Sequence, residues 1–123
     1  MRHYDPAVAP SSDVWLGLDE AERILLVERY HRRVGVALPD ARLHAVIHTI
    51  VESQIAAAVP QVVAAVERLR HEGLDRHESI HAVGSVLIGH IHDAMQAPEL
   101  AGAVGDAYYA GLETLSAASW GAT

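Results

Sequence analysis

The chain has 123 residues, half of them apolar, and its formal net charge is −7. It contains no Cys, which excludes a disulfide framework and a thiolate metal site, and it has no basic cluster beyond Arg32 and Arg33 that would attract nucleic acid. Its longest apolar stretch, residues 55–66, is interrupted by Pro60 and Gln61 and is shorter than the roughly 20 residues that span a bilayer. We therefore expect a cytoplasmic protein that contacts neither a membrane nor nucleic acid.

The first part of the chain is expected to be an arm followed by a capped helix. The first 12 residues include two Pro and two Ser and show no apolar period, so we assign residues 1–18 to an N-terminal arm. A helix is expected over residues 20–33, because Asp19 can cap it and Glu22 stands at the capping-box position. The remainder, residues 19–123, is assigned to a single helical domain.

Four further helices are expected, and their boundaries carry start or stop signals. Pro, Asp or Gly residues mark the boundaries, and Asp75 with Glu78 forms a second capping box. No strand-like alternation competes with the helical period. Short connections make successive helices antiparallel, so the predicted fold is all-α, a four- or five-helix antiparallel bundle. The expected helices span about residues 39–58, 60–71, 76–95 and 98–118.

The composition is unusual in its nine His, as many as Lys and Arg together. His44, His48 and Glu52 stand at positions i, i+4 and i+8 of the expected helix 39–58, so they form one stripe along it. Apolar residues lie within or beside the same stripe, which indicates that the three polar side chains point toward the core. Burying ionisable groups is costly unless they are paired or bind a metal. The stripe is therefore typical of metal ligands.

A second pair, His77 and His81, repeats the i, i+4 spacing on the expected helix 76–95. Two pairs on inward faces can converge around one ion or two neighbouring ions, because imidazole nitrogens bind zinc at about 2.0–2.1 Å and side chains on adjacent turns can share it. Glu52 is expected to be a ligand, or else the carboxylate that orients a ligating His. The predicted metal ligands are His44, His48, Glu52, His77 and His81.

Residues 77–81 also read H-E-S-I-H, which matches the zincin pattern H-E-x-x-H. In that pattern the two His bind zinc and the Glu acts as general base on the attacking water, so Glu78 is a candidate catalytic residue. The longer metzincin pattern ends on a third His, and Leu87 stands at that position, so the metzincin ligand set does not carry over. The alternative role of Glu78 is to complete the capping box with Asp75.

The order of the two pairs resembles a bacterial family of short helical domains of unknown function. The resemblance lies in H-x-x-x-H-x-x-x-E-x-Q from His44 to Gln54, followed by D-x-H-x-x-x-H from Asp75 to His81. It extends over residues 39–109 and includes a Pro and then a Tyr after the second pair. The resemblance implies a helical domain with a His-based site and brings no established activity. It does not require a Glu at position 78, which disfavours the zincin interpretation.

The sequence therefore predicts a metal-binding helical protein with a mononuclear or dinuclear His/Glu site. An open coordination position would permit hydrolysis or oxygen activation on an unidentified small molecule, whereas four His would close a structural site. The alternatives are a zincin-like metallohydrolase and a non-catalytic structural-metal or partner-binding module. Donors without sulfur favour zinc first, iron or manganese next, and also permit nickel or copper. The sequence leaves a homodimer open.

The other His and the aromatic residues have simpler interpretations. His92 lies about 16 Å along the helix from His81, so it cannot share the same ion. Large aromatic residues are more often packing anchors than cofactor ligands. We expect core packing for Trp15, Trp120, Tyr108 and Tyr109, and surface positions for His3, His31, His71 and His90.

Overall fold

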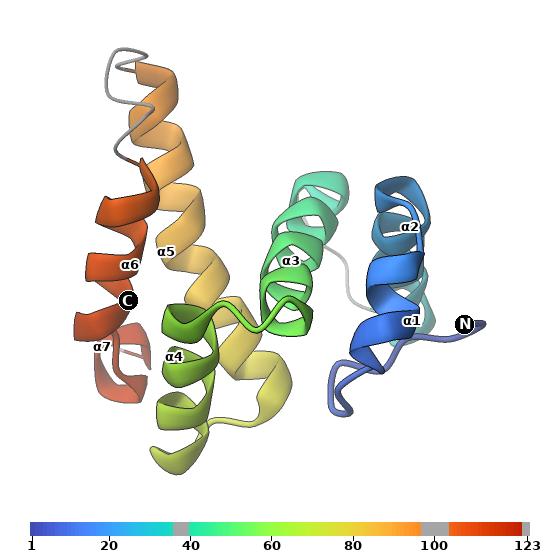
Figure 1. Cartoon of the computed structure of the whole chain (residues 1–123), viewed down its shortest axis with the longest axis horizontal. Helices are drawn as coiled ribbons and strands as arrows, with labels where there is room; N and C mark the ends of the chain where they lie inside the picture. The colour runs from blue at the N-terminus through green and yellow to red at the C-terminus, as the bar shows by residue number, and fades with distance from the viewer. Residues whose placement is uncertain (36–39, 97–103, 122–123) are drawn as a thin grey trace. The chain divides into compact units, whose positions relative to one another are not determined.

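The computed structural model describes residues 1–35, 40–96 and 104–121, and these residues form helices and no strands (Figure 1). The predicted all-α class is therefore confirmed for this part of the chain. The chain divides into two compact units, Met1–Val59 with α1 to α3 and Pro60–Thr123 with α4 to α7. The helices are α1 (Ser12–Gly17), α2 (Glu20–Arg33), α3 (Ala41–Ala56), α4 (Pro60–His71), α5 (Arg76–Gln96), α6 (Val104–Thr114) and α7 (Ala117–Gly121).

Helices α2 and α4 have the bounds that the sequence predicts, and α5 ends within a residue of its expected end. Helix α2 begins after Asp19, whose carboxylate accepts a hydrogen bond of 2.8 Å from the Glu22 backbone N–H. Helix α3 is shorter than expected, because Asp40 is its N-cap and Ala58 has a φ of 57°. A residue in the left-handed region cannot continue a right-handed helix, so α3 ends at Ala56.

The sequence does not predict α1 or the break between α6 and α7. Helix α1 is a short helix inside the expected arm. Ser116 and Ser119 cap α7 reciprocally, because the backbone N–H of each donates to the hydroxyl of the other at 3.0 Å. Local hydrogen bonding of this kind favours a new helix start over continuation of α6. The expected beginning of this helix near residue 98 lies outside the described residues.

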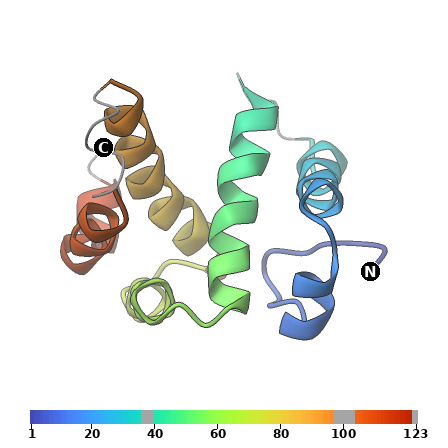
Figure 2. The ribbon, with the colours of Figure 1, turned by 45° about the horizontal axis from the view of Figure 1, so that its top comes forward.

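The first unit is organised around α3, which packs against both α1 and α2 (Figure 2). Its core includes Ile24 and Val27 from α2, Ala45 from α3, Trp15 from α1, and Tyr4 from the segment before α1. The rings of Tyr4 and Trp15 have centroids 5.3 Å apart and are almost fully buried. The residues that we expected to form an arm therefore supply two aromatic rings to this core.

The second unit is formed by mutual packing of α4, α5 and α6. Leu69, Ile80 and Leu112 are fully buried. The Arg68 guanidinium donates hydrogen bonds to the backbone carbonyls of Leu112 at 2.6 Å and Leu115 at 3.0 Å. Carbonyls in the last turn of a helix lack intrahelical partners, so Arg68 ties α4 to the end of α6.

The expected aromatic anchors are buried to different extents. Trp15 and Tyr108 are buried, which confirms the prediction for them, and Tyr109 and Trp120 are half-buried. Burial raises the pKa of the Tyr108 phenol, and the neighbouring Tyr109 raises it further. Tyr108 therefore stays neutral at physiological pH and acts as a packing residue.

In the described part of the chain, no single helix is long and apolar enough to cross a membrane. Helices α3 and α4 taken together pass the same test of length and composition, as core helices also do. The apolar residues of α3 include Ala45, Ile47 and Val51, all of which are buried.

We expect Trp15→Ala to lower the free energy of unfolding by about 3–5 kcal/mol, because it removes a fully buried ring and leaves a cavity. Trp120→Ala is the matched control, since that ring is half-buried and its loss should have a smaller effect. Urea denaturation followed by far-UV circular dichroism measures both values. Equal destabilisation by the two variants would contradict the described core.

Candidate metal centre

Three His side chains of the first unit gather where α2 meets α3. His31 lies in the last turn of α2, and His44 and His48 are one turn apart on α3. One ring nitrogen from each lies within 4.8 Å of those of the other two. His31 and His48 are buried and His44 is half-buried. These three residues can hold a metal ion, and they confirm that the His44–His48 stripe faces inward.

The hydrogen bonding of His31 fixes which of its nitrogens can bind a metal. Its Nδ1 lies 2.9 Å from the backbone carbonyl oxygen of Val27. A carbonyl only accepts, so the proton of the neutral ring is on Nδ1 and the lone pair is on Nε2. Metal-binding His residues commonly donate their other N–H to a carbonyl in this way. His31 is therefore oriented as an Nε2 ligand.

The nitrogens of His31 and His44 already have the separation expected of two ligands. Their Nε2 atoms are 3.2 Å apart. In a tetrahedral zinc site with bonds of about 2.0–2.1 Å, neighbouring nitrogens are roughly 3.3 Å apart. The contact is a hydrogen bond when His44 carries its proton on Nε2, and it becomes a pair of ligands when that proton moves to Nδ1.

His48 is oriented by a tyrosine and a carboxylate. The Tyr4 hydroxyl donates to Glu52 Oε2, and its oxygen lies 2.8 Å from His48 Nε2. A phenol has one proton, and Tyr4 gives it to the carboxylate, so His48 Nε2 must be the donor in the second contact. The lone pair of His48 is then on Nδ1. The chain of contacts therefore leaves Nδ1 as the nitrogen of His48 that could bind a metal.

This chain of contacts is fully buried, since Tyr4, His48 and Glu52 are 1%, 2% and 1% exposed. A buried carboxylate is costly without hydrogen bonds or a positive charge nearby. Tyr4 supplies the hydrogen bond, and Arg33 holds the segment that carries Tyr4 by donating to the Tyr4 carbonyl at 3.0 Å. A divalent cation beside His48 would add the positive charge.

The position of Glu52 bears on its predicted role. The sequence allows Glu52 to be a metal ligand or the carboxylate that orients a ligating His. Glu52 contacts the Tyr4 hydroxyl, which in turn contacts His48. This arrangement matches the orienting role, in which a carboxylate polarises a His through its second nitrogen. Direct ligation by Glu52 stays a prediction.

The second predicted pair lies in the second unit. His77 and His81 are one turn apart on α5, with ring centroids 4.1 Å apart, and both are half-buried. The predicted spacing of this pair along one helical face is therefore observed. Their convergence with His44 and His48 on a shared ion stays a prediction from the sequence.

Glu78 has a defined structural role. Its carboxylate accepts a hydrogen bond of 3.1 Å from the Asp75 N–H, and its own N–H donates to the Asp75 carboxylate at 2.7 Å. These reciprocal bonds confirm the predicted capping box. Glu78 is exposed, and the capping box gives its carboxylate a structural role. Catalysis by Glu78 stays a prediction.

Two residues of the candidate centre, His31 and Tyr4, were not predicted from the sequence. His31, which we expected at the surface, is 5% exposed, so that expectation is wrong. The apolar period of α2 could have predicted the burial of His31, because His31 follows Ile24 and Val27 at helical spacing on the buried face. Tyr4 gave no signal, since its segment has no period. His3 and His71 are exposed as expected.

His90 also departs from the expected surface position, because it is half-buried. Its Nε2 would lie 3.2 Å from a Cβ atom added at Gly111. Helices α5 and α6 therefore approach closely here, and a glycine on α6 makes room for the ring.

Metal-free protein is expected to lose stability as the pH falls below about 6.5. Burial lowers the pKa of His31, although its hydrogen bond to the Val27 carbonyl opposes the shift. The unfolded state then binds more protons than the folded state at pH values between the lowered pKa and the unfolded value near 6.5. The stability contributed by neutral His31 is complete above this window and is lost as the pH falls through it.

Urea midpoints measured in the presence of a chelator between pH 7.5 and pH 5 test this expectation. The urea midpoint should change less with pH in His31→Gln than in wild type. In His71→Gln, whose ring is exposed, it should change with pH as it does in wild type. Identical slopes in wild type and His31→Gln would contradict the expected effect of burial.

No protein-family model matches the chain, and no curated protein or solved structure matches it. The resemblance to a bacterial family of short helical domains therefore stays a prediction from the two motifs.

Proposed function

We propose that this chain is a metal-binding helical protein whose centre is built on α2 and α3. His31 and His44 serve as Nε2 ligands and His48 serves as an Nδ1 ligand. The observation that carries the proposal is the gathering of three His nitrogens within 4.8 Å, together with the 3.2 Å separation of two of them. Two of the rings are buried, where protonated His would be costly and neutral, metal-bound His is favoured.

The orientation of the ligands supports the same function. His31 donates to a backbone carbonyl, and His48 donates to a tyrosine that is hydrogen-bonded to a carboxylate. The lone pair of His31 is then on Nε2, the nitrogen 3.2 Å from His44 Nε2, and the lone pair of His48 is on Nδ1. Partners of this kind fix the ring orientation and raise the basicity of metal-binding His. In the proposed site, Tyr4 and Glu52 act on the metal through His48.

The ligand set favours a metal ion of borderline or hard Lewis acidity, and it leaves open which group occupies the fourth coordination position. Imidazole donors without sulfur suit zinc first, then iron or manganese, and also accept nickel or copper. With three His and a solvent molecule, the centre would have an open position, which hydrolysis or oxygen activation on a small molecule requires. With His81 or His77 as a fourth ligand, it would be a closed structural site.

The second candidate function is a zincin-like hydrolase based on His77, Glu78 and His81. The half-buried pair of rings on α5 favours it, because His77 and His81 have the i, i+4 spacing of the two zinc ligands in H-E-x-x-H. Engagement of the Glu78 carboxylate in the capping box disfavours it. The two candidates predict different sensitivities to substitution.

Protein purified without a His tag should retain at least about half an equivalent of a transition metal per chain. His31→Ala, His44→Ala and His48→Ala should each lower metal affinity by about a hundredfold or more, because each removes a ligand. Elemental analysis and competition with a chromophoric chelator measure content and affinity. Metal-free protein that also takes up no Zn²⁺, Fe²⁺, Mn²⁺, Ni²⁺ or Cu²⁺ would refute the proposal.

The matched controls are His71→Ala and His90→Ala, which should leave metal affinity unchanged. His77→Ala and His81→Ala then test the predicted sharing of an ion by both pairs. Loss of metal in these two variants, as well as in the α3 variants, supports a site with both pairs. If only His77→Ala and His81→Ala lose the metal, the proposed centre is wrong and the zincin-like hydrolase is favoured.

A double-mutant cycle separates the two roles of Glu52. If Glu52 acts through Tyr4, Tyr4→Phe and Glu52→Gln should each lower metal affinity by about 10- to 100-fold. The double variant should then have the same metal affinity as the single variant that binds metal less tightly. If Glu52 binds the metal itself, Glu52→Gln should be far more damaging than Tyr4→Phe and the two effects should add. Glu78→Gln is the control and should be nearly silent, since Gln also completes a capping box.

A further inference from the structure

The N-terminal segment, residues 1–11, precedes α1 and contains no helix or strand. Tyr4 and Pro6 are buried, and most of its other residues are exposed. The ring of Tyr4 packs against Trp15, with centroids 5.3 Å apart, and against Tyr30 at 6.2 Å. A segment with few buried residues and no regular hydrogen bonding can open locally while the rest of its unit stays folded.

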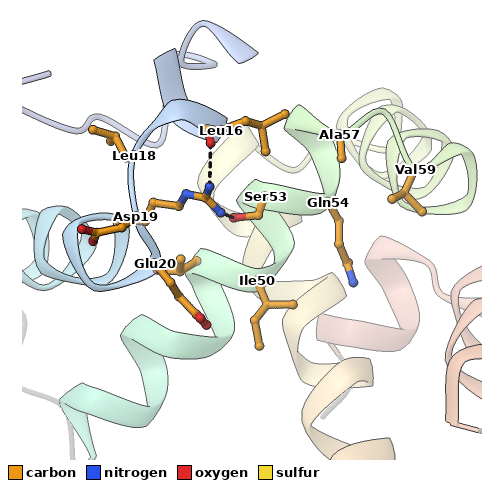
Figure 3. A pocket seen from close by; sticks show the side chains of 11 residues that line it. Leu16, Leu18, Asp19, Glu20, Ile50, Ser53, Gln54, Ala57 and Val59 are labelled. Carbon is orange, nitrogen blue, oxygen red and sulfur yellow. Dashed lines mark hydrogen bonds between the residues drawn. The ribbon is translucent and has the colours of Figure 1, made fainter. Parts of the chain in front are cut away.

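Helix α1, which follows this segment, is held by hydrogen bonds from α2 and α3. The Arg23 guanidinium on α2 donates to the carbonyls of Trp15 and Leu16, each at 3.0 Å. It also donates to Ser53 Oγ on α3 at 3.3 Å, and the Trp15 indole N–H donates to the same oxygen at 3.1 Å (Figure 3). These bonds lie beside a pocket of about 530 Å³ that is lined by residues of α1, α2 and α3. The N-terminal segment can therefore detach while α1 stays in place.

Tyr4 links the N-terminal segment to the proposed metal centre. Its hydroxyl donates to Glu52 Oε2 and accepts from His48 Nε2 at 2.8 Å. A metal ion bound to His48 Nδ1 withdraws electron density from the ring, so Nε2–H becomes a stronger donor, and hydrogen bonds from positively charged donors are stronger than those from neutral ones. A metal ion at Nδ1 therefore strengthens the bond from His48 to Tyr4.

We propose that a metal ion on His31, His44 and His48 holds the N-terminal segment in its docked position and that loss of the metal releases it. This inference rests on the proposed function. Linkage is reciprocal, so the factor by which docking raises metal affinity is the factor by which bound metal favours docking. Detachment uncovers the Trp15 ring and the Glu52 carboxylate. Occupancy of the centre thus controls which surface the first unit presents.

Cleavage of the Arg2–His3 bond by trypsin in the full chain, with and without Zn²⁺, tests this proposal. A protease binds residues on both sides of the bond that it cuts, so Tyr4 has to leave its buried position first. When opening and closing are fast relative to cleavage, the cleavage rate is proportional to the population of the open form. Zinc should slow the loss of residues 1–2, measured by intact mass spectrometry, about 10- to 100-fold. A short arginine peptide in the same solutions corrects for any effect of zinc on trypsin.

Two variants separate the link to the metal from the attachment of the segment. Tyr4→Phe keeps the ring and removes the hydroxyl, so zinc at saturating concentration should change its Arg2–His3 cleavage rate by less than about twofold. Arg33→Gln is the matched control, because it removes the hydrogen bond to the Tyr4 carbonyl and leaves the hydroxyl intact. Its cleavage should be faster than that of wild type in both conditions, and zinc should slow it by the wild-type factor.

Competition with a chromophoric chelator in the same samples distinguishes failure of this inference from failure of the proposed function. If zinc does not bind, both are wrong. If zinc binds and leaves the cleavage rate of wild type unchanged, only this inference is wrong. Faster cleavage with zinc would also overturn it and would indicate that Glu52 leaves Tyr4 to bind the metal. Equal slowing in wild type and Tyr4→Phe would overturn it too, because the Tyr4 hydroxyl would then not carry the effect.

Discussion

The first unit depends on how a carboxylate is accommodated in an apolar core. Glu52 points inward from α3 and is 1% exposed, so it must be hydrogen-bonded. The Tyr4 hydroxyl meets this need, and to do so the segment before α1 has to return and pack against α3. The same hydroxyl then requires His48 to be the donor in their contact. The burial of one acidic residue thereby orders the N-terminal segment and decides which nitrogen of His48 can bind a metal.

Helix α3 presents two kinds of chemistry on two faces. One face carries His44, His48 and Glu52 toward α2 and the Tyr4 segment. The other carries Thr49 and Ser53 into a pocket shared with α1 and α2. Because neighbouring residues are about 100° apart on a helix, adjacent positions serve different sites. A helix of 16 residues therefore contributes both to a His cluster that could hold a metal ion and to the lining of a pocket.

Local signals made much of the fold predictable. Capping residues and the apolar period predicted the bounds of α2 and α4 correctly. The inward orientation of His44 and His48 followed from their spacing among apolar residues. The four- or five-helix antiparallel bundle stays a prediction, because short connections alone do not determine how helices pack against one another. Tyr4 was not predicted because its role comes from a contact with a residue far away in the sequence. Helical periodicity does not predict contacts of this kind. His31 was predictable in principle, since it continues the buried face of α2, but a single His on a helix is usually a surface residue.

The central claim concerns specific ring nitrogens, so the most direct measurement is long-range ¹H–¹⁵N NMR of the His side chains during a Zn²⁺ titration. Before zinc, His31 should be the Nδ1–H tautomer and His48 the Nε2–H tautomer. With one equivalent of zinc, the ¹⁵N shifts of His31 Nε2, His44 Nε2 and His48 Nδ1 should move to values of metal-bound nitrogen. The account would be contradicted if these three nitrogens kept their shifts, or if zinc bound His48 through Nε2.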